Sequence, residues 1–277
     1  MTARIALAAL FVVPAAMAYP WPSVADRWLL GIAVVAGLVL FAWWRGSFVT
    51  TLVGRRLAMW RRRNHTTGVH KSSAYTTVLL QVDGPELLPL PLIAGYLDRY
   101  GVRCDKIRVT RRHLNGARTT WVGLTIGAVD NLIALRARSS RIPLRDTAEV
   151  VGRRLADHLR ESGWSVALID DTETPVRDGA KESWRGLRDA AGFVAAYRVP
   201  VEDGFDKVWA APSSETWSAL EITGTAADLR TTAACAIRTD DKPLVIAGVT
   251  PLNGRHLPAL EALSPSSVRR LEALTGT

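Results

Sequence analysis

The chain has 277 residues, of which 48% are hydrophobic, and a formal net charge of +9. This length is ample for one or two domains with packed cores, which excludes a small, disulfide-dependent scaffold. The excess positive charge is concentrated in residues 45–71, which hold seven Arg and Lys residues and no Asp or Glu. Because the rest of the chain is close to neutral, the composition argues against nucleic-acid binding.

Residues 28–44 are predicted to form a transmembrane helix. The segment contains no charged side chain, and Arg27 and Arg45 bracket it. At 1.5 Å per residue it would span roughly 25 Å, close to the ~30 Å hydrocarbon core of a bilayer. Trp43 and Trp44 at its end fit the headgroup level, where tryptophan is enriched.

Residues 5–21 form an earlier hydrophobic segment with two interpretations. Pro14 and Pro20 interrupt it, so it could be a kinked membrane helix that pairs with residues 28–44 as a hairpin. It could instead be a signal peptide, because residues 16–18 match the A-x-A cleavage pattern. Arg4 is the sole basic residue before the apolar run, which favours the hairpin.

The positive-inside rule predicts the orientation of these segments. The loop 19–27 has no net charge, whereas residues 45–71 are strongly basic. We therefore expect a two-pass protein of the inner membrane, with its N-terminus and large C-terminal domain in the cytoplasm. Ala33 and Gly37 lie four residues apart, a spacing that lets another helix approach closely, although small residues are common in any membrane helix.

Residues 45–63 are predicted to continue as a basic helix at the membrane interface, with 64–73 as a polar linker. Its apolar stripe and opposing arginines suit contact with anionic lipid headgroups or an acidic partner. The alternative is that the basic residues only determine the membrane topology. The predicted membrane or partner contacts are Ala33, Gly37, Trp43, Trp44, Arg55, Trp60, Arg61, Arg62 and Arg63. The expected organisation is a helical hairpin (1–45), a basic helix and linker (46–73) and a cytoplasmic domain (74–277).

The region after residue 74 alternates strand and helix patterns. Strands are predicted at 75–82, 102–111, 119–126, 164–169, 192–199, 217–223 and 231–238, and helices at 91–100, 128–138, 143–162 and 267–274. Asn115-Gly116 predicts a type I′ hairpin turn. The expected fold class is two N-terminal transmembrane α-helices followed by a soluble α/β domain with a mixed, partly antiparallel sheet.

No specific catalytic, cofactor or metal motif is present in the sequence. It contains neither a phosphate-binding glycine loop nor a nucleophile elbow. Asp170, Asp171 and Glu173 follow a predicted strand, where carboxylates can hold a divalent metal as in nucleotide-sugar transferases, but acidic loops at strand ends are also common. Cys104 and Cys235 are expected to be reduced thiols.

The order of segments resembles the EccE family of type VII (ESX) secretion systems. The stretches that carry the resemblance cover most of residues 28–170 and include Leu90–Gly101, Thr120–Thr125, Asp130–Ser139, Ile142–Val150 and Arg154–Arg160, with Glu215–Trp217 matching a later family stretch.

The resemblance implies a structural, non-catalytic subunit of an inner-membrane complex. It implies EccB-, EccC- and EccD-like neighbours, with EccC as the motor ATPase, and no cofactor. Two alternatives remain from the residues themselves: a membrane-anchored, transferase-like enzyme using the 170–173 loop, and an adaptor domain that binds a small ligand.

Overall fold

The computed structural model describes residues 74–271 except for 85–86, 138–142, 202–203 and 226–227. It also describes residues 54–60 and a few positions before residue 49. The chain divides into two compact units, Met1–Thr67 and Gly68–Thr277. Most of the two predicted membrane helices, including Ala33 as well as Gly37, lies outside the described residues. Among the residues that are described, no helix is long and apolar enough to cross a membrane.

In the first unit, the described elements include a short strand pair and a helix. Strand β1 (Trp43–Trp44) pairs antiparallel with β2 (Ser47–Phe48), so this stretch is extended where the sequence analysis expected a helix. Residues 54–60 are helical. On that helix Met59 is buried and Trp60 is exposed.

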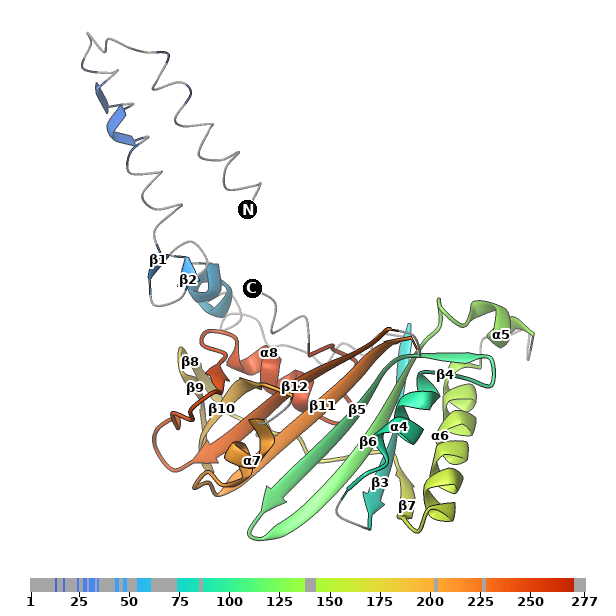
Figure 1. Cartoon of the computed structure of the whole chain (residues 1–277). Coiled ribbons are helices and arrows are strands. Elements are labelled where there is room, and N and C mark those ends of the chain that lie inside the picture. The colour runs from blue at the N-terminus through green and yellow to red at the C-terminus, as the bar shows by residue number, and fades with distance from the viewer. Residues whose placement is uncertain are drawn as a thin grey trace. The chain divides into compact units, whose positions relative to one another are not determined.

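The second unit is built on one large sheet, with strand order β7-β3-β6-β5-β11-β12-β10-β9-β8 (Figure 1). Every strand pair in the described part of the chain is antiparallel, and β4 and β13 add short ladders to β5 and β10. The strands are β3 (Tyr75–Asp83), β4 (Asp98–Arg99), β5 (Val102–Leu114), β6 (Ala117–Gly127), β7 (Ser165–Ile169), β8 (Lys181–Ser183), β9 (Gly186–Asp189), β10 (Gly192–Val199), β11 (Glu215–Thr225), β12 (Asp228–Thr239) and β13 (Thr250–Pro251).

The expected fold class is therefore wrong: the domain is dominated by an antiparallel sheet with few helices, not by a mixed α/β sheet. The sheet stays antiparallel because its connections are mostly hairpins, and because the long excursion through α6 returns as β7 antiparallel to β3. The helices are α4 (Leu90–Ala94), η1 (Gly95–Leu97), α5 (Leu132–Arg136), α6 (Leu144–Glu161), α7 (Gly204–Trp209) and α8 (His256–Leu263).

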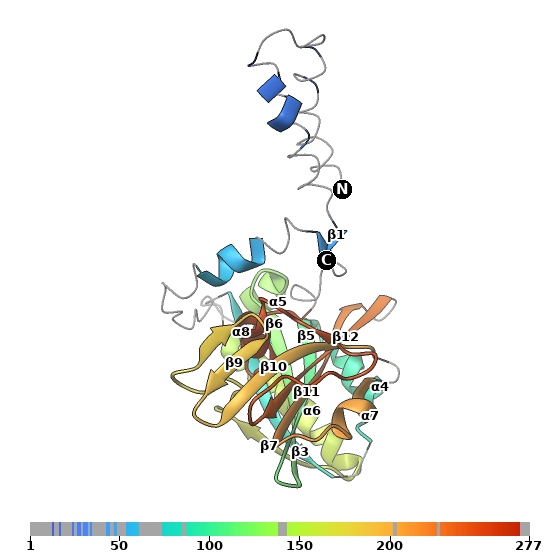
Figure 2. The ribbon, with the colours of Figure 1, turned by 90° about the vertical axis from the view of Figure 1, so that its left-hand side faces the viewer.

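One face of the sheet, called here the apolar face, packs against α4, η1, α6 and α7. Successive side chains of a strand point to opposite faces, so Ile107 and Val109 of β5 join Leu155 and the rest of α6 in one hydrophobic cluster. A second cluster on this face includes Cys235 of β12 and Val208 of α7. In Figure 2, α4 and α7 lie to one side of the strands.

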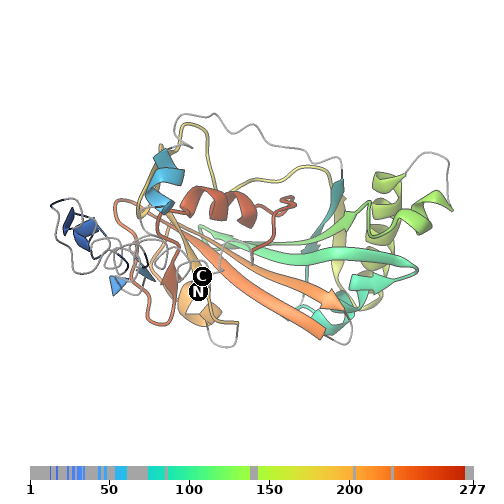
Figure 3. The ribbon, with the colours of Figure 1, turned by 90° about the horizontal axis from the view of Figure 1, so that it is seen from above.

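The opposite face, called here the charged face, carries Lys106, Arg108 and Arg112 on β5. Alpha-helix α8 lies along this face, as Figure 3 shows, and the chain continues over it to Leu271. The carbonyl oxygen of Pro265 lies 3.0 Å from the position that a Cβ at Gly123 of β6 would occupy. A glycine at this position therefore lets the C-terminal segment approach the sheet closely.

The elements with strong local patterns agree with expectation and others do not. The strands near 75–82, 164–169 and 192–199 and the 143–162 helix are confirmed. The expected 91–100 helix ends early, in η1 and β4. The last helix of the described residues is His256–Leu263, and residues 267–271 of the expected 267–274 helix are not helical. Short elements were also not predicted from the sequence, among them β8, β9, β13 and α7.

Candidate functional site: buried charge clusters and the C-terminal segment

The charged face holds a buried cluster, the C-terminal clasp, formed by Lys106, Arg108 and Glu221. Strands β5 and β11 place Arg108 opposite Glu221 in register. The guanidinium Nη2 of Arg108 lies 2.6 Å from Oε2 of Glu221, and Nζ of Lys106 lies 3.5 Å from the same oxygen. All three side chains are almost fully buried. Two buried cations thus share one carboxylate, and main-chain groups must supply the remaining hydrogen bonds.

Those main-chain groups come from the C-terminal segment 262–271. Arg108 donates from Nη1 to the carbonyl oxygens of Ser264 (3.1 Å) and Ser267 (3.3 Å). Leu271 donates its backbone N–H to Oε1 of Glu221 over 2.8 Å. Further bonds reach the carbonyls of Ala262 and Arg269. The clasp therefore fixes a segment that, after α8, has no regular secondary structure of its own.

Burial perturbs the titration of the clasp. Burial and the neighbouring Arg108 lower the pKa of Lys106 to about 7, while Glu221 acts in the opposite direction. Burial also lowers the pKa of Arg108, again opposed by Glu221. The cluster is costly to desolvate, which is typical of a group retained for specific geometry instead of net stability.

A second buried cluster lies further along the same face, around Glu215 at the start of β11. Its Oε1 accepts from Nε of Arg112 at 2.6 Å, and its Oε2 accepts from Nε of Arg238 at 2.9 Å. Arg238 also donates to both carboxylate oxygens of Asp189, at 2.7 and 2.8 Å. Burial alone would raise the pKa of Glu215, but the hydrogen bonds from Arg238 and Arg112 hold it below its usual value.

Aromatic rings seal this second cluster. Trp217 stacks on Trp121 with ring centroids 5.5 Å apart, and the guanidinium of Arg112 lies 5.2 Å from the Trp217 ring centroid. The indole N–H of Trp217 donates to Glu215 over 3.0 Å. Neither cluster was predicted from the sequence, although charged residues at alternate positions of an otherwise apolar strand, such as Lys106 and Arg108, were a visible signal.

The acidic 170–173 loop does not converge on one point. Asp170 pairs with Arg145 at 2.8 Å, and Glu173 pairs with Arg112 at 2.8 Å. Asp171 accepts a hydrogen bond from the backbone N–H of Thr172. Across the described parts of the chain, no group of three or more His, Cys, Asp or Glu residues could hold a metal ion. The loop therefore gives no geometric support to the transferase-like alternative.

The hollows among the described residues include a polar one and an apolar one. The polar one, of about 390 Å³, lies where β11 and β12 meet the start of β5, and four of its charged side chains form ion pairs, Arg270 with Asp105 and Arg230 with Asp228. The apolar one, of about 370 Å³, lies between α7 and residues 244–247. Neither combines a mostly apolar lining with several converging polar groups, the combination that is typical of small-molecule sites.

The predicted contact residues of the first unit are only partly described. Trp43 and Trp44 form β1, and Arg55 and Trp60 lie on the 54–60 helix. Arg61, Arg62 and Arg63 lie outside the described residues. Cys104 and Cys235 are both buried free thiols, and burial raises the pKa of Cys104 to about 12.

The described part of the second unit is an antiparallel sheet domain whose buried charged side chains bond to one another and to the C-terminal segment. Residues 115–199 match the family model described as "Putative type VII ESX secretion system translocon, EccE". The chain is 53% identical to the ESX-3 secretion system protein EccE3 of Mycolicibacterium smegmatis over 98% of this chain and 90% of that protein. It is 47% identical to the EccE3 protein of Mycobacterium tuberculosis over 98% and 87%.

The chain therefore belongs to the EccE family, as its sequence resemblance predicted, and it is a component of a type VII (ESX) secretion system. Such a component is part of a hetero-oligomeric assembly associated with a membrane.

Proposed function

We propose that this chain is a structural, non-catalytic subunit of an ESX-3-type secretion complex in the inner membrane. The observation that carries the proposal is the near full-length likeness to proteins named as ESX-3 components. The buried charged groups of the sheet support it, because they bond the C-terminal segment and each other instead of lining an open site.

The proposal includes the position of the compact unit. The basic residues of 45–71 support a cytoplasmic location for residues 74–277, with 46–73 as the connector, because positive charge beside a membrane marks its cytoplasmic side. In this arrangement Trp43, Trp44, Arg55, Trp60 and Arg61–Arg63 contact anionic lipid headgroups or an acidic neighbour. The neighbours proposed are EccB-, EccC- and EccD-like subunits, with EccC as the motor. Ala33 and Gly37 stay predicted helix-packing positions.

The test is purification of the tagged full chain in a mild detergent, with mass spectrometry of the co-purifying proteins. We expect a large complex containing the EccB-, EccC- and EccD-like subunits in constant ratio. A chain recovered alone at monomer size contradicts the proposal. As a control, the same purification after raising salt to about 0.5 M separates charge-held contaminants from a stable core, because surface ion pairs are screened at that ionic strength.

A further inference from the structure

The turn between β4 and β5 presents an aromatic residue in an unfavourable backbone conformation. Arg99 pairs with Val102, which leaves Tyr100 and Gly101 as a two-residue loop. Both loop residues have positive φ, 57° for Tyr100 and 70° for Gly101, as a type I′ turn requires. Asn, Asp or Gly is preferred at the first position, and a bulky residue there is an outlier. Turn formation therefore does not account for the tyrosine.

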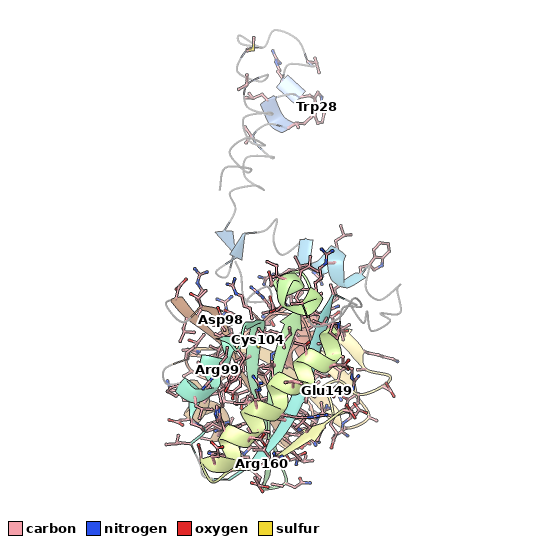
Figure 4. All side chains as sticks on the ribbon, turned by 90° about the vertical axis from the view of Figure 1, so that its right-hand side faces the viewer. Trp28, Asp98, Arg99, Cys104, Glu149 and Arg160 are labelled. Carbon is pink, nitrogen blue, oxygen red and sulfur yellow. The ribbon has the colours of Figure 1, made fainter. Side chains whose placement is uncertain are left out.

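Two arginines stack on this tyrosine. The guanidinium carbon of Arg154, on α6, lies 4.3 Å from the Tyr100 ring centroid, and that of Arg99 lies 5.2 Å from it. Figure 4 shows Arg99 beside α6. Within the described residues neither arginine forms an ion pair, whereas the neighbouring Arg153 pairs with Glu149. A guanidinium that stacks on a ring keeps its N–H edge available for bidentate hydrogen bonding to a carboxylate.

Helix α5 and the turn that precedes it hold apolar side chains in solvent. Asn131 is buried and makes three hydrogen bonds, to the backbone N–H of Arg103 (2.7 Å), to its carbonyl (2.8 Å) and to the carbonyl of Gly127 (2.9 Å). Yet Val129 and Ile133, four residues apart, are 80% and 89% exposed. These exposed residues are therefore displayed by a firmly anchored turn.

We propose that Arg99, Tyr100, Arg154, Val129 and Ile133, the Tyr100 surface, dock an acidic segment of a neighbouring protein subunit. The segment supplies carboxylates to the two arginines and apolar side chains to Val129 and Ile133. The inference deepens the proposed function and rests on it, since the occupant is another subunit of the complex. Tyr and Arg anchors beside apolar contacts are typical of the residues that dominate binding energy at protein interfaces.

The observations favour a protein occupant over an anionic bilayer. The exposed carboxylates of Asp98 and Asp130 lie on the same edge, flanking Tyr100 and Val129. They repel a uniformly anionic lipid surface, whereas a peptide segment can place discrete carboxylates at the two arginines and other side chains beside Asp98 and Asp130. Two stacked, preorganised guanidiniums also fit discrete carboxylates better than diffuse headgroup charge, for which flexible side chains serve as well.

The test places a photoreactive amino acid at Ile133 in the full chain, in cells that assemble the secretion complex. The same amino acid at Val245, which is fully exposed on the loop beside α7, is the control position. We expect Ile133 to cross-link to a peptide rich in Asp and Glu from one other subunit, identified by mass spectrometry. We expect no such cross-link from Val245.

Charge and turn variants then identify the groups responsible. Arg154→Glu is expected to lower the Ile133 cross-link yield roughly tenfold, the effect of losing a central charged anchor. Arg153→Glu, one residue away but paired with Glu149, is the matched control and should leave the yield within twofold. Tyr100→Asn restores the preferred turn residue, so it should keep the fold yet lower the yield roughly tenfold.

Several outcomes overturn the inference. These are adducts of Ile133 with lipid alone, an intact purified complex with no cross-link at Ile133, and equal losses from Arg153→Glu and Arg154→Glu. An intact complex without the cross-link rejects the Tyr100 surface and leaves the proposed function standing. Recovery of the tagged chain without other secretion subunits rejects the proposed function itself.

Discussion

The two faces of the central sheet are covered in different ways. On the apolar face, β5 contributes Ile107 and Val109 to a cluster closed by α6, a long helix with its own amphipathic pattern. On the charged face, the same strand contributes Lys106 and Arg108, which bond to the carbonyls of a segment without regular structure. One strand therefore serves two kinds of packing, because its side chains alternate in direction.

The two covering elements differ in how their backbone hydrogen-bonding groups are satisfied. A helix satisfies its own backbone groups, so it can rest on apolar side chains alone. The segment after α8 cannot, and its carbonyls need donors from the sheet once they are buried. Arg108, with five N–H groups, is suited to serve several carbonyls and one carboxylate together.

The largest expected effect comes from breaking the clasp. Glu221→Leu leaves Lys106 and Arg108 buried without their carboxylate, so the free energy of unfolding should fall by about 3–5 kcal/mol. Denaturant titration followed by tryptophan fluorescence measures this loss. Trypsin should also cleave at Arg269 and Arg270 sooner in the variant, because the segment loses its bond from Leu271 to Glu221.

Glu173→Gln is the control for that variant. Glu173 also pairs with a sheet arginine, Arg112, but its side chain is 69% exposed. An exposed pair contributes less than about 1 kcal/mol, so stability and protease sensitivity should barely change. Equal losses from Glu173→Gln and Glu221→Leu would show that burial does not distinguish the two carboxylates.

On the apolar face, Leu155→Ala should lower the free energy of unfolding by about 3 kcal/mol. Leu155 is fully buried where α6 meets the sheet, and truncation there leaves a cavity that the rigid strands cannot close. The same denaturant titration measures this loss of free energy of unfolding. In contrast with Glu221→Leu, trypsin cleavage at Arg269 and Arg270 should be unaffected below the unfolding transition. Early cleavage there would mean that the two faces are not independent.

The apolar face was largely predictable from sequence, and the charged face was not. The 143–162 helix and the Asn115-Gly116 hairpin follow from local signals, namely helical periodicity and a type I′ turn pair, and both are confirmed. The mixed sheet was a wrong expectation, because strand direction depends on how distant segments pair. The clasp joins Arg108 to carbonyls more than 150 residues away, and no local pattern encodes such contacts.

The last helix illustrates the same limit. Residues 267–274 have helical composition, yet residues 267–271 follow the sheet in irregular form because Arg108 and Glu221 bind their backbone groups. Short elements such as β8 and α7 were missed because a segment of three to six residues is too short to show a recognisable hydrophobic periodicity. Family membership, by contrast, was recoverable from sequence because it rests on many weak matches spread along the chain.

A buried histidine makes the charged face sensitive to acid. His256, at the start of α8, is fully buried, and its Nδ1 accepts a hydrogen bond from the backbone N–H of Ala196. Burial lowers its pKa to about 4, while the backbone of Trp184 acts in the opposite direction. Between pH 6.5 and 4 the unfolded chain therefore binds a proton that the folded chain does not, and the free energy of unfolding falls as pH falls.

From this histidine we expect a loss of about 2 kcal/mol between pH 7 and pH 5. In His256→Asn, which keeps an acceptor but does not titrate, that part of the pH dependence should disappear. Denaturant titrations of both proteins at a series of pH values give the difference in slope. Parallel curves for the two proteins across this range contradict the assignment.

The smallest effects concern the two turns that bound β5, the strand shared by both faces. Asn115-Gly116 and Tyr100-Gly101 have the same signs of φ, with 51° at Asn115 and 57° at Tyr100. Only the first uses a residue that accepts this conformation readily. Tyr100→Asn should therefore raise the free energy of unfolding by up to about 1 kcal/mol, less whatever the stacking of Arg99 and Arg154 on the ring contributes.

The reciprocal substitution, Asn115→Tyr, should lower the free energy of unfolding by about 1 kcal/mol, because it introduces the same strain without the two arginines that stack on Tyr100. Denaturant titration of the pair compares one turn geometry with and without stacking cations. If Tyr100→Asn instead destabilises the chain by more than Asn115→Tyr does, the tyrosine is required for the stability of the fold. If Tyr100→Asn stabilises the chain but abolishes the cross-link through Ile133, the tyrosine serves to bind the partner subunit.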